Sequence, residues 1–93
     1  MTPNVEEARV PAFARGVRLR HDAARDAWIV LGPERMFTPD EHPLAVLKLV
    51  DGQRSIGAVI DELAWLFNAP REVIADDVVE MLNDLAGKGA VTL

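Results

Sequence analysis

The stretch VRLRHDAARDAWIVLGPERMFTPDE, residues 17–41, decides the fold, because short strands are followed there at once by a helix start. Apolar and polar side chains alternate over residues 17–21, which is the period of a half-buried strand. Residues 22–26 form a polar connection of hairpin length, and the aromatic and β-branched run 27–31 predicts a second strand. Gly-Pro then ends that strand, and residues 35–38 predict a third. We therefore expect a three-stranded antiparallel meander with its third strand at an edge.

Three helices are predicted after the sheet. Thr38 and Glu41 form a capping box for the first helix, although Pro43 is also compatible with a regular helix that begins only near His42, and we expect this helix to end near Val50. Ser55 caps the second, and the third occupies residues 70–88. The apolar stripes of the last two helices consist of Ile56, Ile60, Leu63 and Phe67, and of Ile74, Val78, Met81, Leu82 and Leu85. The expected fold is α+β and winged-helix-like, a three-stranded sheet followed by three helices, which must cover one face of that sheet.

The length of 93 residues suits one small domain. Residues 1–12 contain two prolines and no apolar period, so we expect them to be a flexible N-terminal arm on a single domain of residues 13–93. The longest apolar run is far short of the roughly 20 residues of a membrane span, and the first residues do not form a signal peptide. We therefore expect a cytoplasmic protein with no membrane partner.

Charge and composition argue against several functions. The net charge of −5 lies entirely from Ser55 onward, where seven acidic residues face two basic ones. The second and third helices resemble a helix-turn-helix, so a winged-helix DNA-binding regulator is the alternative function. The third helix, however, carries five carboxylates and two cations, which would repel phosphates. Cysteine is absent, and neither His21 nor His42 has partners at metal-ligand spacing, so we expect no metal, no cofactor and no enzyme activity.

Two features of the sequence favour a binding surface. The third strand, residues 35–38, leaves one row of backbone groups unpaired, which an added peptide strand can satisfy. The third helix has a broader apolar arc than one packing stripe needs, and this arc either packs on the other helices or lines a groove. We expect Trp28 in the core. Trp65 lies off the stripe of its helix and is either an exposed partner contact or a filler under the N-terminal arm.

Over residues 11–93 the sequence resembles the PqqD family of pyrroloquinoline quinone (PQQ) biosynthesis. The features that carry the resemblance, in this order and at these spacings, are Arg15-Gly16-Val17-Arg18-Leu19, Trp28 and Leu31, Pro33-Glu34, Asp51-Gly52, Ile60 and Leu63, Asp77-Val78 with Leu82 and Leu85, and Lys88-Gly89. The resemblance implies a peptide chaperone that binds the precursor peptide PqqA and presents it to the radical SAM enzyme PqqE. It also implies a peptide clamp in which PqqA adds as an antiparallel strand beside the third helix.

The binding surface that this resemblance implies has two walls. On the strand it comprises Arg35, Met36, Phe37 and Thr38, and on the helix Asp77, Val78, Met81 and Leu82. Val78 and Met81 could equally be core residues. A free edge strand can also pair with its own copy, so both a monomer and a homodimer are compatible with the sequence.

Overall fold

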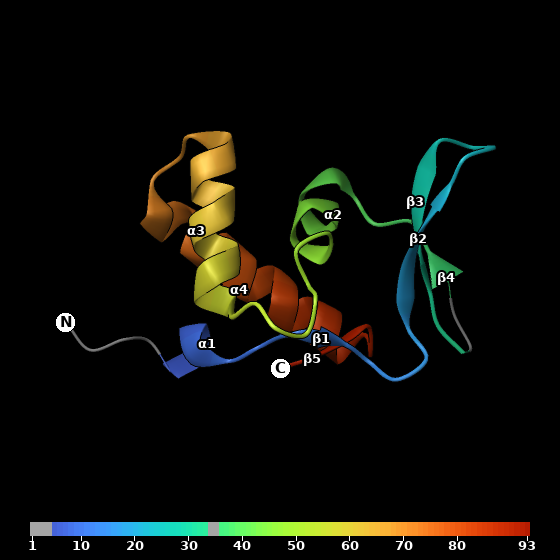
Figure 1. Cartoon of the computed structure of the whole chain (residues 1–93), viewed down its shortest axis with the longest axis horizontal. Helices are drawn as coiled ribbons and strands as arrows, with labels where there is room; N and C mark the ends of the chain where they lie inside the picture. Colours follow the sequence, from blue (N-terminus) through green and yellow to red (C-terminus); the bar gives the residue numbers. More distant parts are fainter. Residues whose placement is uncertain (1–4, 34–35) are drawn as a thin grey trace.

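The computed structural model describes residues 5–33 and 36–93, and it has the expected α+β order of a three-stranded sheet followed by three helices (Figure 1). Within these residues no helix is long and apolar enough to cross a membrane. In chain order the elements are α1 (Val5–Ala8), β1 (Ala12–Phe13), β2 (Arg18–Asp22), β3 (Ala27–Leu31), β4 (Met36–Phe37), α2 (Glu41–Leu47), α3 (Ile56–Phe67), α4 (Arg71–Gly87) and β5 (Val91–Thr92).

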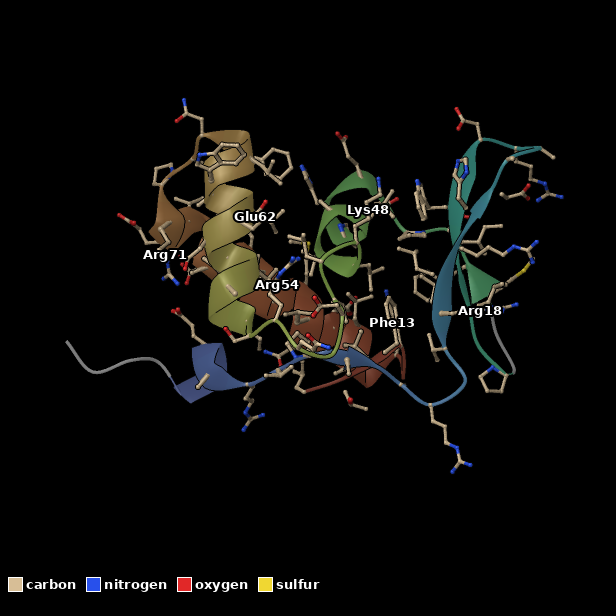
Figure 2. All side chains as sticks on the ribbon, in the orientation of Figure 1. Phe13, Arg18, Lys48, Arg54, Glu62 and Arg71 are labelled. Atoms are coloured by element: carbon tan, nitrogen blue, oxygen red, sulfur yellow. The ribbon has the colours of Figure 1, made fainter. Side chains whose placement is uncertain are left out.

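The three-stranded sheet has the order β2-β3-β4, with both pairs antiparallel. Leu19 lies opposite Val30, and Val30 lies opposite Phe37, so these three side chains share one face. That face packs on the helical core, where Val30 is buried. The other face carries Arg18 and Met36 and points away from the helices (Figure 2). The sheet forms one end of an elongated molecule of 45 × 26 × 19 Å (Figure 1).

The predicted helical stripes form most of the core, with three exceptions. On α3, Ile56, Ile60 and Leu63 are buried, and on α4 Val78, Leu82 and Leu85 are buried. Phe67 continues the α3 stripe but is 54% exposed, and Ile74 and Met81 on α4 are only partly buried. The two helices pack against each other, and α2 contributes Val46 and Leu47 to the same core.

The Thr38 cap and the end near Val50 that we expected for the first predicted helix are wrong, whereas the alternative start near His42 lies one residue from the observed start at Glu41. Asp40, not Thr38, holds the N-cap position of α2, because its carbonyl oxygen accepts the first helical bond from the Leu44 N–H at 2.9 Å. Pro43 then falls in the first turn, where an amide needs no intrahelical partner. The last turn tightens into bonds between residues three apart, as in Val50 N–H to the Leu47 oxygen, so α2 ends at Leu47. The Ser55 cap of α3 is confirmed, since its hydroxyl accepts from the Ala58 N–H at 3.1 Å.

Trp28 lies outside the buried core in which we expected it. Its ring is partly buried and packs against the His21 ring, with 5.0 Å between centroids, on the hairpin. The Lys48 Nζ sits 4.8 Å from the Trp28 ring centroid, which is within cation–π range. Trp28 therefore joins the far end of the sheet to the end of α2, at the margin of the core.

The segment that we expected to be a flexible arm is packed on the domain over its described residues. Helix α1 packs against α3, and Pro11 is fully buried. The Arg9 carbonyl accepts a hydrogen bond from the Ile56 N–H at 2.8 Å. Gly57 permits this close approach, because a Cβ at that position would lie 3.3 Å from the Glu7 carbonyl oxygen. Residues 1–4 lie outside the described residues.

Two long-range contacts fasten this segment. Strand β1 pairs antiparallel with β5, with Phe13 opposite Val91, in a second sheet that the sequence pattern does not reveal. Arg71 at the start of α4 bonds Glu7 of α1 and Asp61 of α3, each at 2.6 Å (Figure 2). The hydrogen bond to Glu7, followed by the one to Asp61, raises the pKa of the Arg71 guanidinium above its ordinary value, so the cation persists at any working pH.

Candidate functional site

A groove lies between the edge strand β4 and helix α4. It encloses about 400 Å³, and we call it the strand groove. Its strand wall is formed by Phe37 with the segment leading into α2, and its helix wall by the last turns of α4. The lining residues are Phe37, Thr38, Pro39, Asp40, Pro43, Glu80, Met81, Asp84, Leu85 and Lys88.

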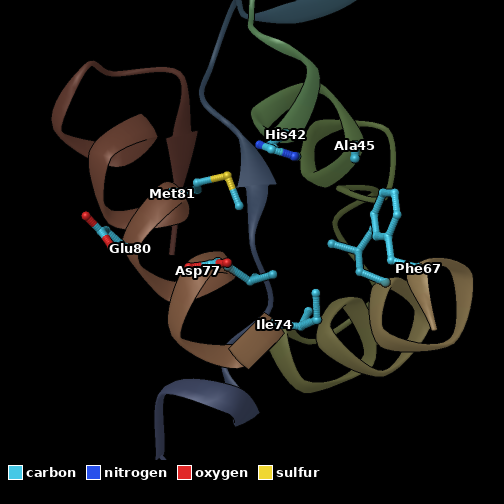
Figure 3. Close-up of a pocket in the computed structure, with 9 residues that line it drawn as sticks. His42, Ala45, Phe67, Ile74, Asp77, Glu80 and Met81 are labelled. Atoms are coloured by element: carbon cyan, nitrogen blue, oxygen red, sulfur yellow. The ribbon is translucent and has the colours of Figure 1, made fainter. Parts of the chain in front are cut away.

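A second cavity, of about 560 Å³, opens among α2, α3 and α4, and we call it the helix pocket (Figure 3). Its walls are mostly apolar, with carboxylates and one imidazole among them. Glu80 and Met81 line both cavities, so the helix pocket adjoins the strand groove along α4. The lining residues are His42, Ala45, Leu63, Phe67, Ile74, Asp77, Val78, Glu80 and Met81.

The predicted strand residues divide between the two faces of β4. Phe37 is half-buried and lines the strand groove, and Thr38 is exposed beside it. Met36 is 66% exposed and points to the opposite face, because successive side chains of a strand alternate. Arg35 lies outside the described residues. Among the described strands only β3 pairs with β4, so the other edge of β4 has its backbone groups free.

The predicted helix residues fall into two groups. Asp77 is exposed and Met81 partly buried, and both line the helix pocket. Val78 is 1% exposed and belongs to the core, although it reaches the pocket wall. Leu82 is fully buried and lines neither the strand groove nor the helix pocket. Of the four predicted helix residues, Met81 is therefore the one that lines both the helix pocket and the strand groove.

Sequence reasoning did not select Asp84 and Lys88 as site residues, although both line the strand groove. Their spacing could have identified them. Residues 77, 81, 84 and 88 recur at intervals of four, three and four, so they share one face of a helix with the predicted contacts Asp77 and Met81. The wall residues from α2 and α3, such as His42 and Phe67, had no comparable signal. Their place depends on how three helices meet, which no local pattern contains.

The site has an apolar floor and an acidic rim. Asp40, Glu80 and Asp84 line the strand groove with one cation, Lys88, whose Nζ pairs with Asp84 at 3.0 Å. The same ammonium lies 5.9 Å from the centroid of the Phe37 ring, so it bridges the helix wall and the strand wall. No group of three or more His, Asp or Glu side chains within residues 5–33 and 36–93 is placed to hold a metal ion. Such a site is suited to binding an extended chain with apolar and basic side chains.

An edge strand beside a helix-walled apolar groove, on a three-stranded sheet followed by three helices, defines a class of small recognition domain. A structure with this architecture is the solution structure of the PqqD truncation of Methylobacterium extorquens PqqCD, described as a functional and stand-alone recognition element for ribosomally synthesized and post-translationally modified peptides. Its TM-score is 0.76 at 38% identity, over 94% of this chain and 93% of that one. The crystal structure of PqqD from Xanthomonas campestris matches with a TM-score of 0.55, also at 38% identity, over 91% of this chain and 94% of that one.

The sequence profile of the family described as coenzyme PQQ synthesis protein D (PqqD) matches residues 27–91. The chain belongs to the PqqD family, which confirms the resemblance. A curated relative, the PqqA binding protein of Bradyrhizobium diazoefficiens, is 47% identical over 89 residues, covering 96% of this chain and 86% of the relative. The PqqA binding protein of Gluconobacter oxydans is 48% identical over 87 residues, covering 94% of this chain and 91% of its own length. This family membership supports the expectation of a recognition element and not an enzyme.

Proposed function

We propose that this protein binds the precursor peptide PqqA in PQQ biosynthesis and presents it to the radical SAM enzyme PqqE. The relatives that are 47% and 48% identical are both PqqA binding proteins. The observation that carries the proposal is the combination of a free edge on β4 with the strand groove beside it.

In the proposed binding mode, PqqA adds as an antiparallel strand at β4, beside α4. Its backbone pairs with the free edge of Met36–Phe37, which satisfies groups that otherwise depend on water. Alternate side chains of the peptide then enter the strand groove, where Phe37 and Met81 offer apolar surface. The acidic rim, with Glu80 on the helix wall, favours basic residues in the peptide.

The predicted contact residues take different roles in this mode. Met36, Phe37 and Thr38 contribute backbone to the pairing, and Phe37 and Thr38 also contribute side chains; Arg35, the fourth predicted strand contact, lies outside the described residues. Asp77 and Met81 contact the peptide from the helix, and Val78 forms part of the wall behind them. Leu82, which is fully buried, holds α4 in place from the core side.

A second surface remains accessible when the strand groove is filled. Trp65 is 78% exposed, and it lines neither the strand groove nor the helix pocket. It lies on the outer face of α3, four residues after Asp61, on the opposite side of the helix from Ile60. We assign this face to the contact with PqqE, because an exposed tryptophan is a common energetic anchor of protein interfaces.

The test is an NMR titration of labelled protein with synthetic PqqA of Bradyrhizobium diazoefficiens, the source of one curated relative. Saturable shifts on Met36–Thr38 and on the last turns of α4 are expected. N-methylation of single PqqA amides then tests strand addition, because only alternate amides of an added strand point at β4. Equal loss at every position, or shifts confined to other elements, would exclude this binding mode. Absence of binding to PqqA would exclude the function.

Two matched measurements separate the alternatives. Duplex DNA should produce no salt-sensitive shifts, since α4 is acidic, and binding of DNA through α4 would favour a transcriptional regulator instead. Sedimentation with and without PqqA tests self-association through β4. A homodimer that dissociates as the peptide binds would show that both use the same edge.

A further inference from the structure

The hydrophobic core of this protein is incomplete at one place. The α3 stripe is buried from Ile56 to Leu63, yet Phe67 on the same face is 54% exposed. The α4 stripe likewise ends in Ile74, which is only partly buried. The helix pocket lies between these two ends, so the apolar side chains on either side of it are only partly covered. Unlike a scattered surface residue, Phe67 is exposed because a cavity occupies the position of its neighbour.

The pocket is large enough to admit a large side chain of another molecule together with part of its backbone. Its volume of about 560 Å³ lies within the range of about 300–1,000 Å³ that is typical of ligand sites. Figure 3 shows Ala45 and Phe67 on the side of the pocket away from Met81 and Glu80. Ala45 adds little bulk from α2, so its short side chain leaves the space open.

The charge at the pocket defines what kind of side chain it accepts. Asp77 and Glu80 line it, and none of its lining residues is lysine or arginine. An apolar interior beside two carboxylates is complementary to an apolar side chain with a cationic neighbour. The pocket adjoins the strand groove at Glu80 and Met81, so a chain bound along α4 can reach both.

We propose that the helix pocket is a specificity site, which takes one large apolar side chain of the bound peptide while an adjacent lysine or arginine pairs with Asp77. This inference rests on the proposed function and adds the chemistry of the peptide segment. Peptides that merely pair with β4 would bind weakly, and the apolar-basic element would select the correct precursor. The bound side chain would complete the core between Phe67 and Ile74.

The test compares substitutions inside and beside the pocket, with synthetic PqqA of Bradyrhizobium diazoefficiens as the probe. Ala45→Phe places an aromatic ring in the pocket and should weaken binding about tenfold or more, because the apolar side chain of the peptide loses part of its space and its burial. Asp77→Lys should weaken binding about five- to tenfold at low salt, and less at high salt. Asp76→Lys is the matched control, since Asp76 is also exposed on α4 but does not line the pocket; it should stay within about twofold.

An alanine scan of PqqA completes the test. One apolar residue of the peptide should be needed by the wild-type protein and not by Ala45→Phe, which is the signature of direct contact. If Ala45→Phe unfolds the protein, the binding measurement on Asp77→Lys still tests the role of the helix pocket, because an exposed helix position tolerates this substitution.

Three results would overturn the inference. If PqqA binds the wild type and both pocket variants equally, the helix pocket has no role and the proposed function stands. If PqqA does not bind the wild type, the proposed function fails and the inference fails with it. If Ala45→Phe instead converts a wild-type dimer into a monomer, a second copy of the chain occupies the pocket.

Discussion

The contact between Glu7 and Arg71 should fasten the N-terminal segment to the helical core. One Arg71 nitrogen, Nη2, lies 2.6 Å from Glu7 Oε1, and Nη1 lies 3.4 Å from Oε2, so the pairing is two-pronged. The Glu7 side chain is only 24% exposed, and that of Arg71 is 42% exposed. Exposed pairs contribute about 0.2–1 kcal/mol. Because this pair is two-pronged and partly shielded, we expect a coupling energy near the upper end, about 1 kcal/mol.

A double-mutant cycle measures this coupling. Glu7→Gln, Arg71→Met and the double variant are unfolded in urea, and the non-additive part of the free energy of unfolding is the coupling. Asp84 and Lys88 give the matched control, because their ion pair of 3.0 Å is more than half exposed on both sides. That pair should couple by about 0.3–0.5 kcal/mol. In a domain of this size, 1 kcal/mol corresponds to about 4–8 °C in Tm.

Hydrogen exchange shows where the loss occurs. The Ile56 N–H donates to the Arg9 carbonyl at 2.8 Å, whereas the Val59 N–H donates to Ser55 within α3 at 3.0 Å. Breaking the contact with Glu7 should accelerate exchange at Ile56 well before Val59. A coupling no larger than that of the control pair would refute our account of the N-terminal segment. Equal acceleration at both amides would refute it as well, because it would indicate global unfolding.

Three further predictions concern stability. Leu82→Ala should lower the free energy of unfolding by about 2–5 kcal/mol in urea titrations, because Leu82 is fully buried, and a loss below about 1 kcal/mol would contradict its core position. Gly87→Ala should raise Tm slightly, because a Cβ at this position of α4 would meet no neighbouring atom. Gly89→Ala should lower Tm by the equivalent of about 1 kcal/mol, because φ is +78° at Gly89. Equal effects of the two substitutions would be inconsistent with this backbone geometry. Two backbone N–H groups bond the Asp51 carboxylate and hold its pKa below the ordinary value, so its stabilising contribution is complete above that value and is lost as pH falls through the folded pKa. The difference in urea midpoint between wild type and Asp51→Ala should therefore shrink in acid, and a difference that grows would show the opposite shift.

The family assignment and the site support each other at the level of named residues. The sequence resemblance included Asp77-Val78 and Lys88-Gly89, and the structure places Asp77 at the helix pocket and Lys88 in the strand groove. These positions lie on one face of α4 and its C-cap, so the spacing of three and four residues identifies the side of the helix that faces the two cavities. Leu82 was predicted at the same surface, yet it turns into the core.

Local patterns in the sequence were sufficient for the elements whose causes are local. Alternation over residues 17–21 and the apolar run 27–31 led to the hairpin of β2 and β3, and Ser55 marked the start of α3. These features depend on residues only a few positions apart, so a short segment of sequence is enough to predict them. The class of fold and the edge position of β4 follow from the order of such elements.

Only the tertiary structure decided how distant segments complete one another. The pairing of β1 with β5 joins Phe13 to Val91, and neither two-residue strand has a pattern that indicates its partner. The exposure of Phe67 also escaped prediction, because its stripe is continuous and only the cavity among α2, α3 and α4 leaves it unpacked. The periodicity of a sequence identifies which side of a helix is apolar, whereas the burial of each side chain depends on which other elements pack against that side. The sequence therefore determined the apolar faces of the helices and the edge position of β4, and the packing of the helices determined which of these residues line a cavity.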